Sequence, residues 1–263
     1  METQAIYRQH QKHRWELTDI PWDQMRPNAT ADDLRLARGL AFGESNAIAA
    51  LHLFLNESED DYDFGSYAAI WCFEEIRHHY AFREWLERQG ESLDDANLQA
   101  MRPAYPNGVT PAATIATNLI SELTLTTVYS TLAEHVHDPA LAEILRHASR
   151  DEARHARDFR LFLKRRVDVR RDEMRSVLET LYIYLSDPAR PLKHPVDMFK
   201  TAVTHPSSRA MPDDAFQRFM EVDQDAHHLR KIRSRIMSSF ATVTGYALPD
   251  LAAVRRAVAD LLD

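Results

Sequence analysis

Two short motifs of the same form lie in separate halves of the chain and contain residues suited to metal binding. Glu75 and His78 stand three positions apart in the first motif, and Glu152 and His155 do so in the second. On a helix this spacing places both side chains on one face, one turn apart. A carboxylate and an imidazole in that position can bind one ion together. Each motif therefore predicts half of a metal site.

Each motif also has a lone glutamate upstream, 31 residues before the first motif and 30 before the second. Apolar residues flank all of these positions at steps of three and four, which predicts helices that turn the polar groups toward one core. Burying four unpaired carboxylates would exceed a net stability of roughly 5–15 kcal/mol, and two divalent cations would offset that charge. A single such motif usually lies on a salt-bridged helix surface, but two matched copies favour metal. The predicted ligands are Glu44, Glu75, His78, Glu122, Glu152 and His155.

Acidic residues directly precede both ligand glutamates. Metal-bound histidines usually donate their second ring N–H to a carboxylate. We therefore expect Asp151 to contact His78 and Glu74 to contact His155, each across the two halves. The alternative is that both acids face solvent.

The kind of metal and its chemistry follow from the ligand types. Mixed carboxylate and imidazole ligands that leave open positions favour iron and reaction with oxygen, with manganese as an alternative in one position. Thr126 lies one turn after Glu122, where its hydroxyl could contact bound oxygen. A threonine that bonds to its own helix backbone is the alternative for this residue.

Composition excludes several classes of protein. The chain has 263 residues, 44% of them apolar, with only six glycines and one cysteine, Cys72. One cysteine excludes a disulfide framework and an internal rubredoxin or iron–sulfur module, so electrons would come from a separate partner. A net charge of −8 argues against nucleic-acid binding. No apolar run is long enough for a membrane span and the first residues are polar, so we expect a cytoplasmic protein that binds no membrane.

Helix signals divide the chain into a four-helix core and additional helices. Capping residues and prolines at Thr30, Thr110-Pro111 and Asp138-Pro139 predict helix starts, and Gly90 predicts a helix end. A short helix and an irregular strap with two tryptophans precede the core. We predict a single all-α domain over residues 1–263, with a four-helix bundle at about 30–170 and additional helices at about 171–263. The core helices are expected at 30–56, 62–89, 110–136 and 138–166 around a crossover at 91–109, and the additional helices at 172–185, 195–204, 213–244 and 248–263.

The segments WCFEEIRHH (Trp71–His79) and RDEARH (Arg150–His155) resemble the soluble di-iron ferritin-like oxidases, most closely the acyl-acyl-carrier-protein desaturases. The order and spacing of Glu44 and Glu122 match as well, and the resemblance covers about residues 30–170. It implies a ferritin-like bundle whose di-iron centre activates oxygen and removes hydrogen from an unactivated carbon. It also implies a ferredoxin-type electron donor and a homodimer.

Single positions separate the related protein classes. Phe82 stands where a ribonucleotide reductase radical subunit would have a tyrosine, and Ala148 where an arylamine N-oxygenase would have a histidine. A rubrerythrin-like peroxidase would need rubredoxin cysteines, and a storage ferritin would be shorter. Desaturation or hydroxylation of an acyl-type or other apolar substrate is therefore favoured. An N-oxygenase or other small-molecule oxygenase, and a non-catalytic iron-handling or redox-stress protein, remain alternatives.

Two features bear on the substrate. Trp71, Phe82, Leu119 and Phe159 lie one turn from the ligands and could line or plug a tunnel, and we expect an apolar channel walled by the additional helices. A basic run is usually a solvated helix face, but in an acidic protein it could dock an acidic carrier protein. That run consists of Lys164, Arg165, Arg166, Arg170, Arg171 and Arg175.

Overall fold

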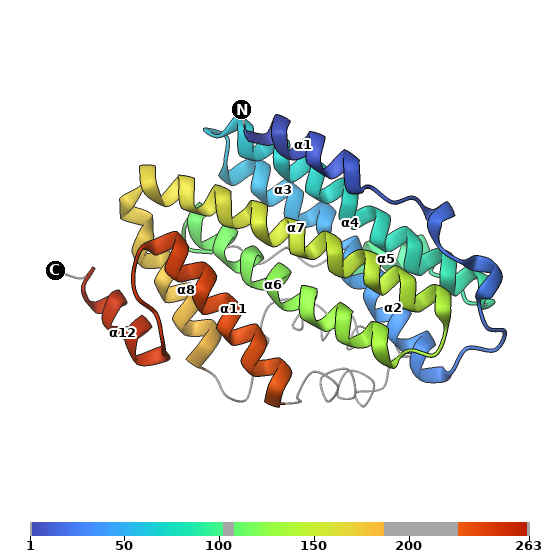
Figure 1. Ribbon diagram of the computed structural model, residues 1–263. Coiled ribbons are helices and arrows are strands. Elements are labelled where there is room, and N and C mark those ends of the chain that lie inside the picture. Colours follow the sequence, from blue (N-terminus) through green and yellow to red (C-terminus); the bar gives the residue numbers. More distant parts are fainter. Residues whose placement is uncertain (1, 102–107, 187–225, 262–263) are drawn as a thin grey trace.

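The computed structural model describes residues 2–101, 108–186 and 226–261, and these residues form helices with no strand among them. The all-α prediction is confirmed. Long helices run side by side to form a bundle (Figure 1). They are α2 (Ala31–Ser45), α3 (Ala47–Glu57), α4 (Tyr62–Arg88), α6 (Pro111–His135) and α7 (Pro139–Val169).

The helices begin and end where the capping signals predict. The side chains of Thr30, Thr110 and Asp138 each accept a hydrogen bond from a backbone N–H in the first turn of α2, α6 and α7. Gly90 follows α4 with φ of 82°, a left-handed conformation that favours glycine. These ends fix the rotation and register of the helices that contain the two motifs.

The prediction of one continuous helix over residues 30–56 is wrong, because the helix is interrupted at Asn46. The N–H of Asn46 bonds to the carbonyl of Gly43 at 3.1 Å, and its side-chain amide donates to the carbonyl of Phe42 at 3.2 Å. Such short-range bonds tighten the turn and compete with the regular α-helical pattern. The irregular turn follows directly after Glu44, so a predicted ligand lies at the end of α2.

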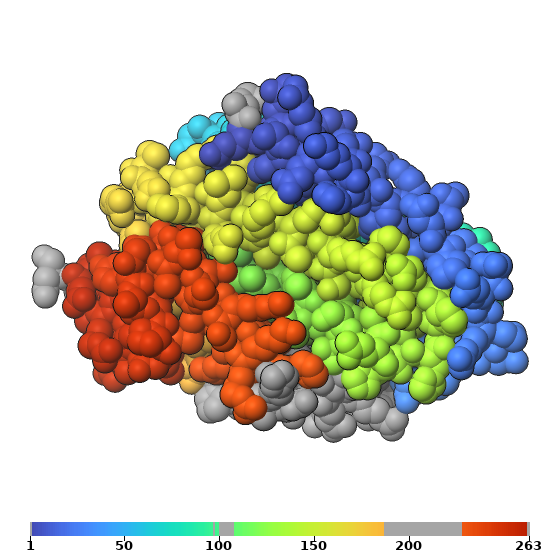
Figure 2. Space-filling model, in the orientation of Figure 1, coloured from blue at the N-terminus to red at the C-terminus, as the bar shows by residue number. Residues whose placement is uncertain are grey.

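The N-terminal segment is a short helix followed by a strap, as predicted. Helix α1 (Glu2–His13) lies along α4, and 3₁₀ turns follow at Leu17–Asp19 and Trp22–Gln24. In the space-filling view the blue N-terminal segment borders α7 at the top of the molecule (Figure 2). Hydrogen bonds hold both ends of this segment. Thr3 Oγ1 donates to the carbonyl of Asp63 at 2.6 Å, and the N–H of Arg26 donates to Asp138 at 2.7 Å.

The remaining described helices are shorter. The predicted crossover contains α5 (Asp95–Met101), a helix that the sequence did not indicate. Helices α8 (Met174–Ser186), α11 (Ala226–Thr244) and α12 (Leu251–Ala259) gather at one end of the bundle (Figure 1). The helix predicted at 195–204 and the first part of the one predicted at 213–244 lie outside the described residues. Within the described ranges, no helix is both long and apolar enough to span a membrane.

The apolar core is divided into two clusters along α4 and α7. One cluster includes Trp71 and Phe159, and the other includes Phe82 and Ala148. On each helix the two clusters lie on opposite sides of the Glu-x-x-His motif. A polar layer therefore crosses the bundle between two apolar layers, and the predicted ligands form it.

Candidate metal centre

The six predicted ligands converge into two overlapping sets. In each set, one ligand atom from every residue lies within 4.8 Å of the others. All six side chains are buried, with at most 5% of any residue exposed. Glu75 and Glu152 belong to both sets, which is the arrangement of two carboxylates shared between neighbouring ions. The sets are Glu44, Glu75, His78 and Glu152, and Glu75, Glu122, Glu152 and His155.

Distances from the imidazole nitrogens fit one cation in each set. His78 Nδ1 lies 3.6 Å from Glu44 Oε2 and 3.6 Å from Glu152 Oε1. His155 Nδ1 lies 3.3 Å from Glu152 Oε2 and 3.7 Å from Glu122 Oε2. Ligands bound about 2.1 Å from one ion lie roughly 3–4 Å apart. These donor atoms are at the spacing that a bound ion requires, whereas His155 Nδ1 lies 2.8 Å from Glu75 Oε1, a hydrogen-bonding distance that a bound ion would have to lengthen.

Unsatisfied polar atoms point to the same conclusion. His78 Nδ1, Glu122 Oε2 and Glu152 Oε1 are buried without a hydrogen-bond partner. Buried side-chain polar atoms almost always have such a partner, so each exception calls for an explanation. A pair of cations bound between these atoms supplies it, and the residues present therefore fit a two-metal centre.

The electrostatics of the carboxylates also favour a cation. Burial, with repulsion from Glu44 and Glu122, raises the pKa of Glu75 well above its ordinary value. Burial, with repulsion from Glu75 and Glu122, does the same to the pKa of Glu152. Without an ion these two groups tend to hold protons, because several negative charges in one buried site repel each other. A divalent ion would reverse that preference.

Each histidine contacts a carboxylate from the other half, through the two pairs named from the sequence. His78 Nε2 lies 2.9 Å from Asp151 Oδ2, and His155 Nε2 lies 2.8 Å from Glu74 Oε2. An ionised carboxylate can only accept a hydrogen bond, so each Nε2 is assigned as the N–H donor. Each Nδ1 is then the nitrogen that faces the candidate ions, and it would have to be unprotonated to bind one.

Further side chains hold Asp151, and the sequence did not reveal them. Trp15 Nε1 donates to Asp151 Oδ2 at 2.8 Å, and Arg77 Nη2 donates to the same oxygen at 3.0 Å. The Trp15 ring also stacks on His147, with ring centroids 4.8 Å apart. The strap after α1 therefore contributes directly to the surroundings of His78.

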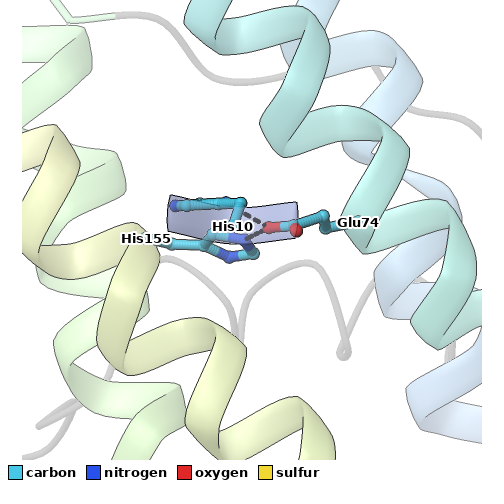
Figure 3. A group of neighbouring side chains, drawn as sticks. All are labelled: His10, Glu74 and His155. Atoms are coloured by element: carbon cyan, nitrogen blue, oxygen red, sulfur yellow. Dashed lines mark hydrogen bonds and ion pairs between the residues drawn. The ribbon is translucent and has the colours of Figure 1, made fainter. Parts of the chain in front are cut away.

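His10 is the most informative residue that the sequence analysis missed. Its Nδ1 lies 2.8 Å from Glu74 Oε2 and its Nε2 lies 2.7 Å from Asp158 Oδ2, and only 1% of the residue is exposed. Figure 3 shows the Glu74 carboxylate directed toward the rings of both His10 and His155. The sequence signal that could have revealed this residue is its position on the helix. His10 continues the buried stripe of α1 formed by Thr3 and Ile6, at helical spacing.

The two upstream glutamates are oriented by neutral donors. Trp71 Nε1 and Asn118 Nδ2 donate to Glu122 Oε1 at 3.1 and 2.9 Å, and the hydroxyl of Tyr129 donates to Glu44 Oε1. In each carboxylate one oxygen is held by these donors while Oε2 faces an imidazole Nδ1. The second oxygen is therefore directed toward the candidate ion.

Thr126 does not extend into this arrangement. Its Oγ1 donates to the carbonyl of Glu122 at 2.7 Å, which is the backbone-bonded alternative considered above. The hydroxyl is engaged by its own helix. The proposed contact between Thr126 and bound oxygen has no support from this geometry.

The basic run is neutralised within the chain. Arg165 pairs with Asp61 and Asp63, and Arg166 pairs with Glu173. The other four cations have acidic partners too, at Asp168, Asp172 and Glu179. This face offers little unpaired positive charge to an acidic carrier protein.

Comparison with solved structures identifies the fold family. No protein-family model and no curated protein matches the chain. Solved structures of R2-like ligand-binding oxidases do match: a variant with an anaerobically reconstituted Mn/Fe cofactor is 16% identical, with a TM-score of 0.57 over 93% of each chain. Another variant, reconstituted aerobically, is 17% identical with a TM-score of 0.56, again over 93% of both chains. The chain has the ferritin-like fold.

The ferritin-like fold accounts for the placement of the ligands, because its bundle presents glutamates and Glu-x-x-His motifs inward from four helices. The sequence resemblance pointed most closely to the desaturases. A protein described as the acyl-ACP desaturase DesA2 from Mycobacterium tuberculosis H37Rv is 18% identical, with a TM-score of 0.45.

Proposed function

We propose that this protein is an oxygen-dependent oxidoreductase with a two-metal centre, containing iron in both positions or iron and manganese. The observation that carries the proposal is the pair of overlapping, buried ligand sets that share Glu75 and Glu152. Mixed carboxylate and imidazole ligands with open positions suit iron and manganese. The R2-like oxidases of the same fold, which were reconstituted with Mn and Fe, lend further support.

When bound, such a pair of redox-active ions would supply the electrons that react with oxygen. The residues of the chain would hold and orient the ions. Asp151 and Glu74 fix the ring orientation of the two histidines, and one oxygen of each upstream glutamate is held away from the ions. The two apolar clusters on either side of the ligand layer exclude bulk water, which limits unproductive side reactions.

We further propose an apolar, acyl-type substrate that is desaturated or hydroxylated, with oxygen as co-substrate. Because a single cysteine leaves no internal iron–sulfur module, we propose that electrons come from a separate partner, and the resemblance implies a donor of the ferredoxin type. We propose a homodimer as the working form, on the resemblance alone. The expected substrate channel stays a prediction, because its proposed wall falls partly on residues 187–225, outside the described ranges.

A second candidate is a metal-handling protein without a substrate, and the packing beside the centre favours it. The ring centroid of Trp71 lies 5.6 Å from that of Phe159 and 5.5 Å from that of Phe54. All three rings are nearly fully buried. Trp71 and Phe159, which were expected to line or plug a tunnel, are thus in close aromatic contact with each other and with Phe54.

Oxygen consumption separates the two candidates. The chain is loaded anaerobically with Fe(II), and oxygen uptake is then followed with a chemical reductant and a panel of fatty acyl compounds. An oxidase consumes oxygen over many turnovers and converts one of these compounds, detected by mass spectrometry. A single uptake limited to the bound iron, with every compound unchanged, contradicts the oxidase and favours metal handling. Glu152→Ala is the control that removes the centre.

A further inference from the structure

His10 lies behind the metal centre on a helix outside the four-helix core. It reaches between α4 and α7, where both of its ring nitrogens contact carboxylate oxygens, from Glu74 and Asp158. Asp158 is also held by Arg157, whose guanidinium donates to both of its oxygens at 2.7 and 2.9 Å. His10 therefore connects a residue that touches a predicted ligand with an ion pair nearer the surface.

The contact with Glu74 is unusual because one oxygen serves two imidazoles. Glu74 Oε2 lies 2.8 Å from His10 Nδ1 and 2.8 Å from His155 Nε2. Ionised carboxylates only accept, so both rings donate to this oxygen and fix it from two directions. Among the described residues, the remaining polar contact of Glu74 is an ion pair with Arg77 at 3.7 Å, which is too long for a hydrogen bond. His10 is thus the main support of Glu74 other than His155 itself.

The three residues of Figure 3 could be taken for a third metal site, but their geometry is that of hydrogen bonds. The separations of 2.7–2.8 Å between nitrogen and oxygen are typical of charge-assisted hydrogen bonds. His10 Nε2 is engaged by Asp158, and His155 Nε2 by Glu74. A third ion would have to displace all of these bonds.

We propose that His10 is a positioning residue for the ion bound by Glu122, His155 and the two shared glutamates. By holding Glu74, it keeps the His155 ring turned so that Nδ1 faces that ion. This inference rests on the proposed two-metal centre. It adds that the two ions depend on different parts of the N-terminal segment, since His10 supports one half and Trp15 the other.

Attachment of α1 strengthens the argument, because a positioning residue must itself be held. The backbone N–H groups of Glu2 and Thr3 donate to the Asp63 carboxylate at 3.1 and 3.2 Å. Arg165 of α7 pairs with Asp63 at 2.7 Å. The start of α1 is therefore bound to the start of α4 and the last part of α7. This attachment holds the helix that carries His10 in place.

A matched pair of variants isolates the bond to Glu74. In His10→Asn the side-chain amide nitrogen takes the place of Nδ1 and can still donate to Glu74. In His10→Gln it takes the place of Nε2 and can donate only to Asp158. Both variants lose the imidazole and one hydrogen bond, so they differ mainly in which carboxylate keeps its donor.

Anaerobic titration with Co(II), followed by its visible absorption, reports the affinity and ligand geometry of each ion. We expect His10→Gln to weaken one of the two binding steps by about 10–100-fold, the usual range for lost outer-shell partners, and to change its spectrum. His10→Asn should stay within about threefold of the wild type. Glu122→Ala should abolish that same step, which identifies it. Thermal melting of the metal-free variants measures any general loss of stability.

The outcomes separate the inference from the proposed function. Equal Co(II) binding by wild type and both variants overturns the role of His10 and leaves the metal centre in place. Equal weakening in both variants, in proportion to their loss of melting temperature, assigns His10 a purely structural role and also overturns it. A wild-type chain that binds no Co(II), Mn(II) or Fe(II) overturns the proposed function together with this inference.

Discussion

The two halves of the candidate metal centre repeat each other in their predicted ligands and differ in the residues that support those ligands. Both contain a Glu-x-x-His motif whose histidine donates to an acid from the opposite half. Behind His78, Asp151 accepts from the indole of Trp15 and the guanidinium of Arg77. Behind His155, Glu74 accepts from His10, which in turn contacts a second acid. Arg154 also pairs with Asp151, so one support consists of arginines and an indole, and the other is a chain of alternating acids and imidazoles.

The difference shows that the repeat extends only as far as the ligands and their first acidic partners. One residue of each outer support, Trp15 or His10, comes from residues 10–15, a segment that has no counterpart among the described residues of the second half of the chain. A nearly symmetric site is therefore stabilised by an asymmetric covering segment. The two ions should respond differently to changes in that segment, and equally to changes in the shared ligands.

The largest expected effect comes from the shared glutamates. Glu75→Ala or Glu152→Ala removes a carboxylate that belongs to both ligand sets, so we expect both ions to be lost or greatly weakened. Glu44→Ala or Glu122→Ala removes a ligand from one set only, and one ion should remain. Metal analysis after anaerobic loading with Fe(II) and dialysis gives the number of ions per chain. If all four variants kept the same number, the two-set arrangement would be wrong.

Removing charge from an acidic support should have the next largest effect. Asp151→Asn keeps the shape of the side chain but replaces the carboxylate that orients His78. We expect the fold and most of the metal to be kept, and the reaction with oxygen to slow by about 10–100-fold. Stopped-flow oxidation of the Fe(II)-loaded protein measures that rate.

Two further variants are needed to interpret the rate measured for Asp151→Asn. Glu74→Gln should slow the reaction by a similar factor, since it removes the equivalent acid of the other half. Asp168→Asn, on an exposed part of α7, should have no effect. An Asp151→Asn rate equal to the wild type would show that the acid does not influence the centre.

Lowering the pH should weaken the binding of both ions, because Glu75 and Glu152 belong to both ligand sets. Burial and the neighbouring carboxylates raise the pKa of Glu75 and of Glu152 in the metal-free chain, so ion binding must displace protons. Affinity should therefore rise with pH and fall on acidification, by about tenfold per pH unit for each proton released. Co(II) titrations between about pH 6 and pH 8, with an indicator dye for released protons, test the sign. Binding that is independent of pH would contradict the raised pKa values.

Much of the fold, and the convergence of the six candidate ligands, was predictable because both follow from local spacing. The positions of Glu75, His78, Glu152 and His155 encode a shared helix face, and caps such as Thr110 and Asp138 mark helix ends within a few residues. The all-α class follows from these helices. The acids Glu74 and Asp151 could be named because they adjoin the ligands in the chain.

What the sequence did not reveal depends on contacts between distant residues. His10 and Asp158 are 148 positions apart, and Trp15 and Asp151 are 136 apart, so no local pattern links them. The break at Asn46 arises from an amide that bonds to its own helix backbone, which helical periodicity does not register. Two donors to the upstream glutamates, Tyr129 and Trp71, were also missed, because both residues fit an apolar helix stripe equally well.

The smallest expected effect tests the support of Asp151 directly, by removing one donor and replacing the indole with a smaller aromatic ring. Trp15→Phe loses the indole N–H that bonds to Asp151 Oδ2, while Arg77 still donates to that oxygen. Hydrogen bonds to charged groups contribute about 1.5–3 kcal/mol, and the remaining guanidinium should keep the loss near the lower end. Urea unfolding of the metal-free chain measures this loss.

Trp85→Phe is the matched control for that experiment. Trp85 is also buried, and its Nε1 donates at 2.9 Å to Asp138, the capping residue of α7, which is not among the predicted ligands or their acidic partners. Both variants should lose similar stability, since each removes an indole bond to a buried carboxylate. Only Trp15→Phe should also weaken the ion bound by His78, by less than Asp151→Asn does, and it should leave the step assigned to His155 unchanged. Equal metal binding in the two variants would limit Trp15 to packing, and His10 would then be the only residue of the N-terminal segment with a specific link to one ion.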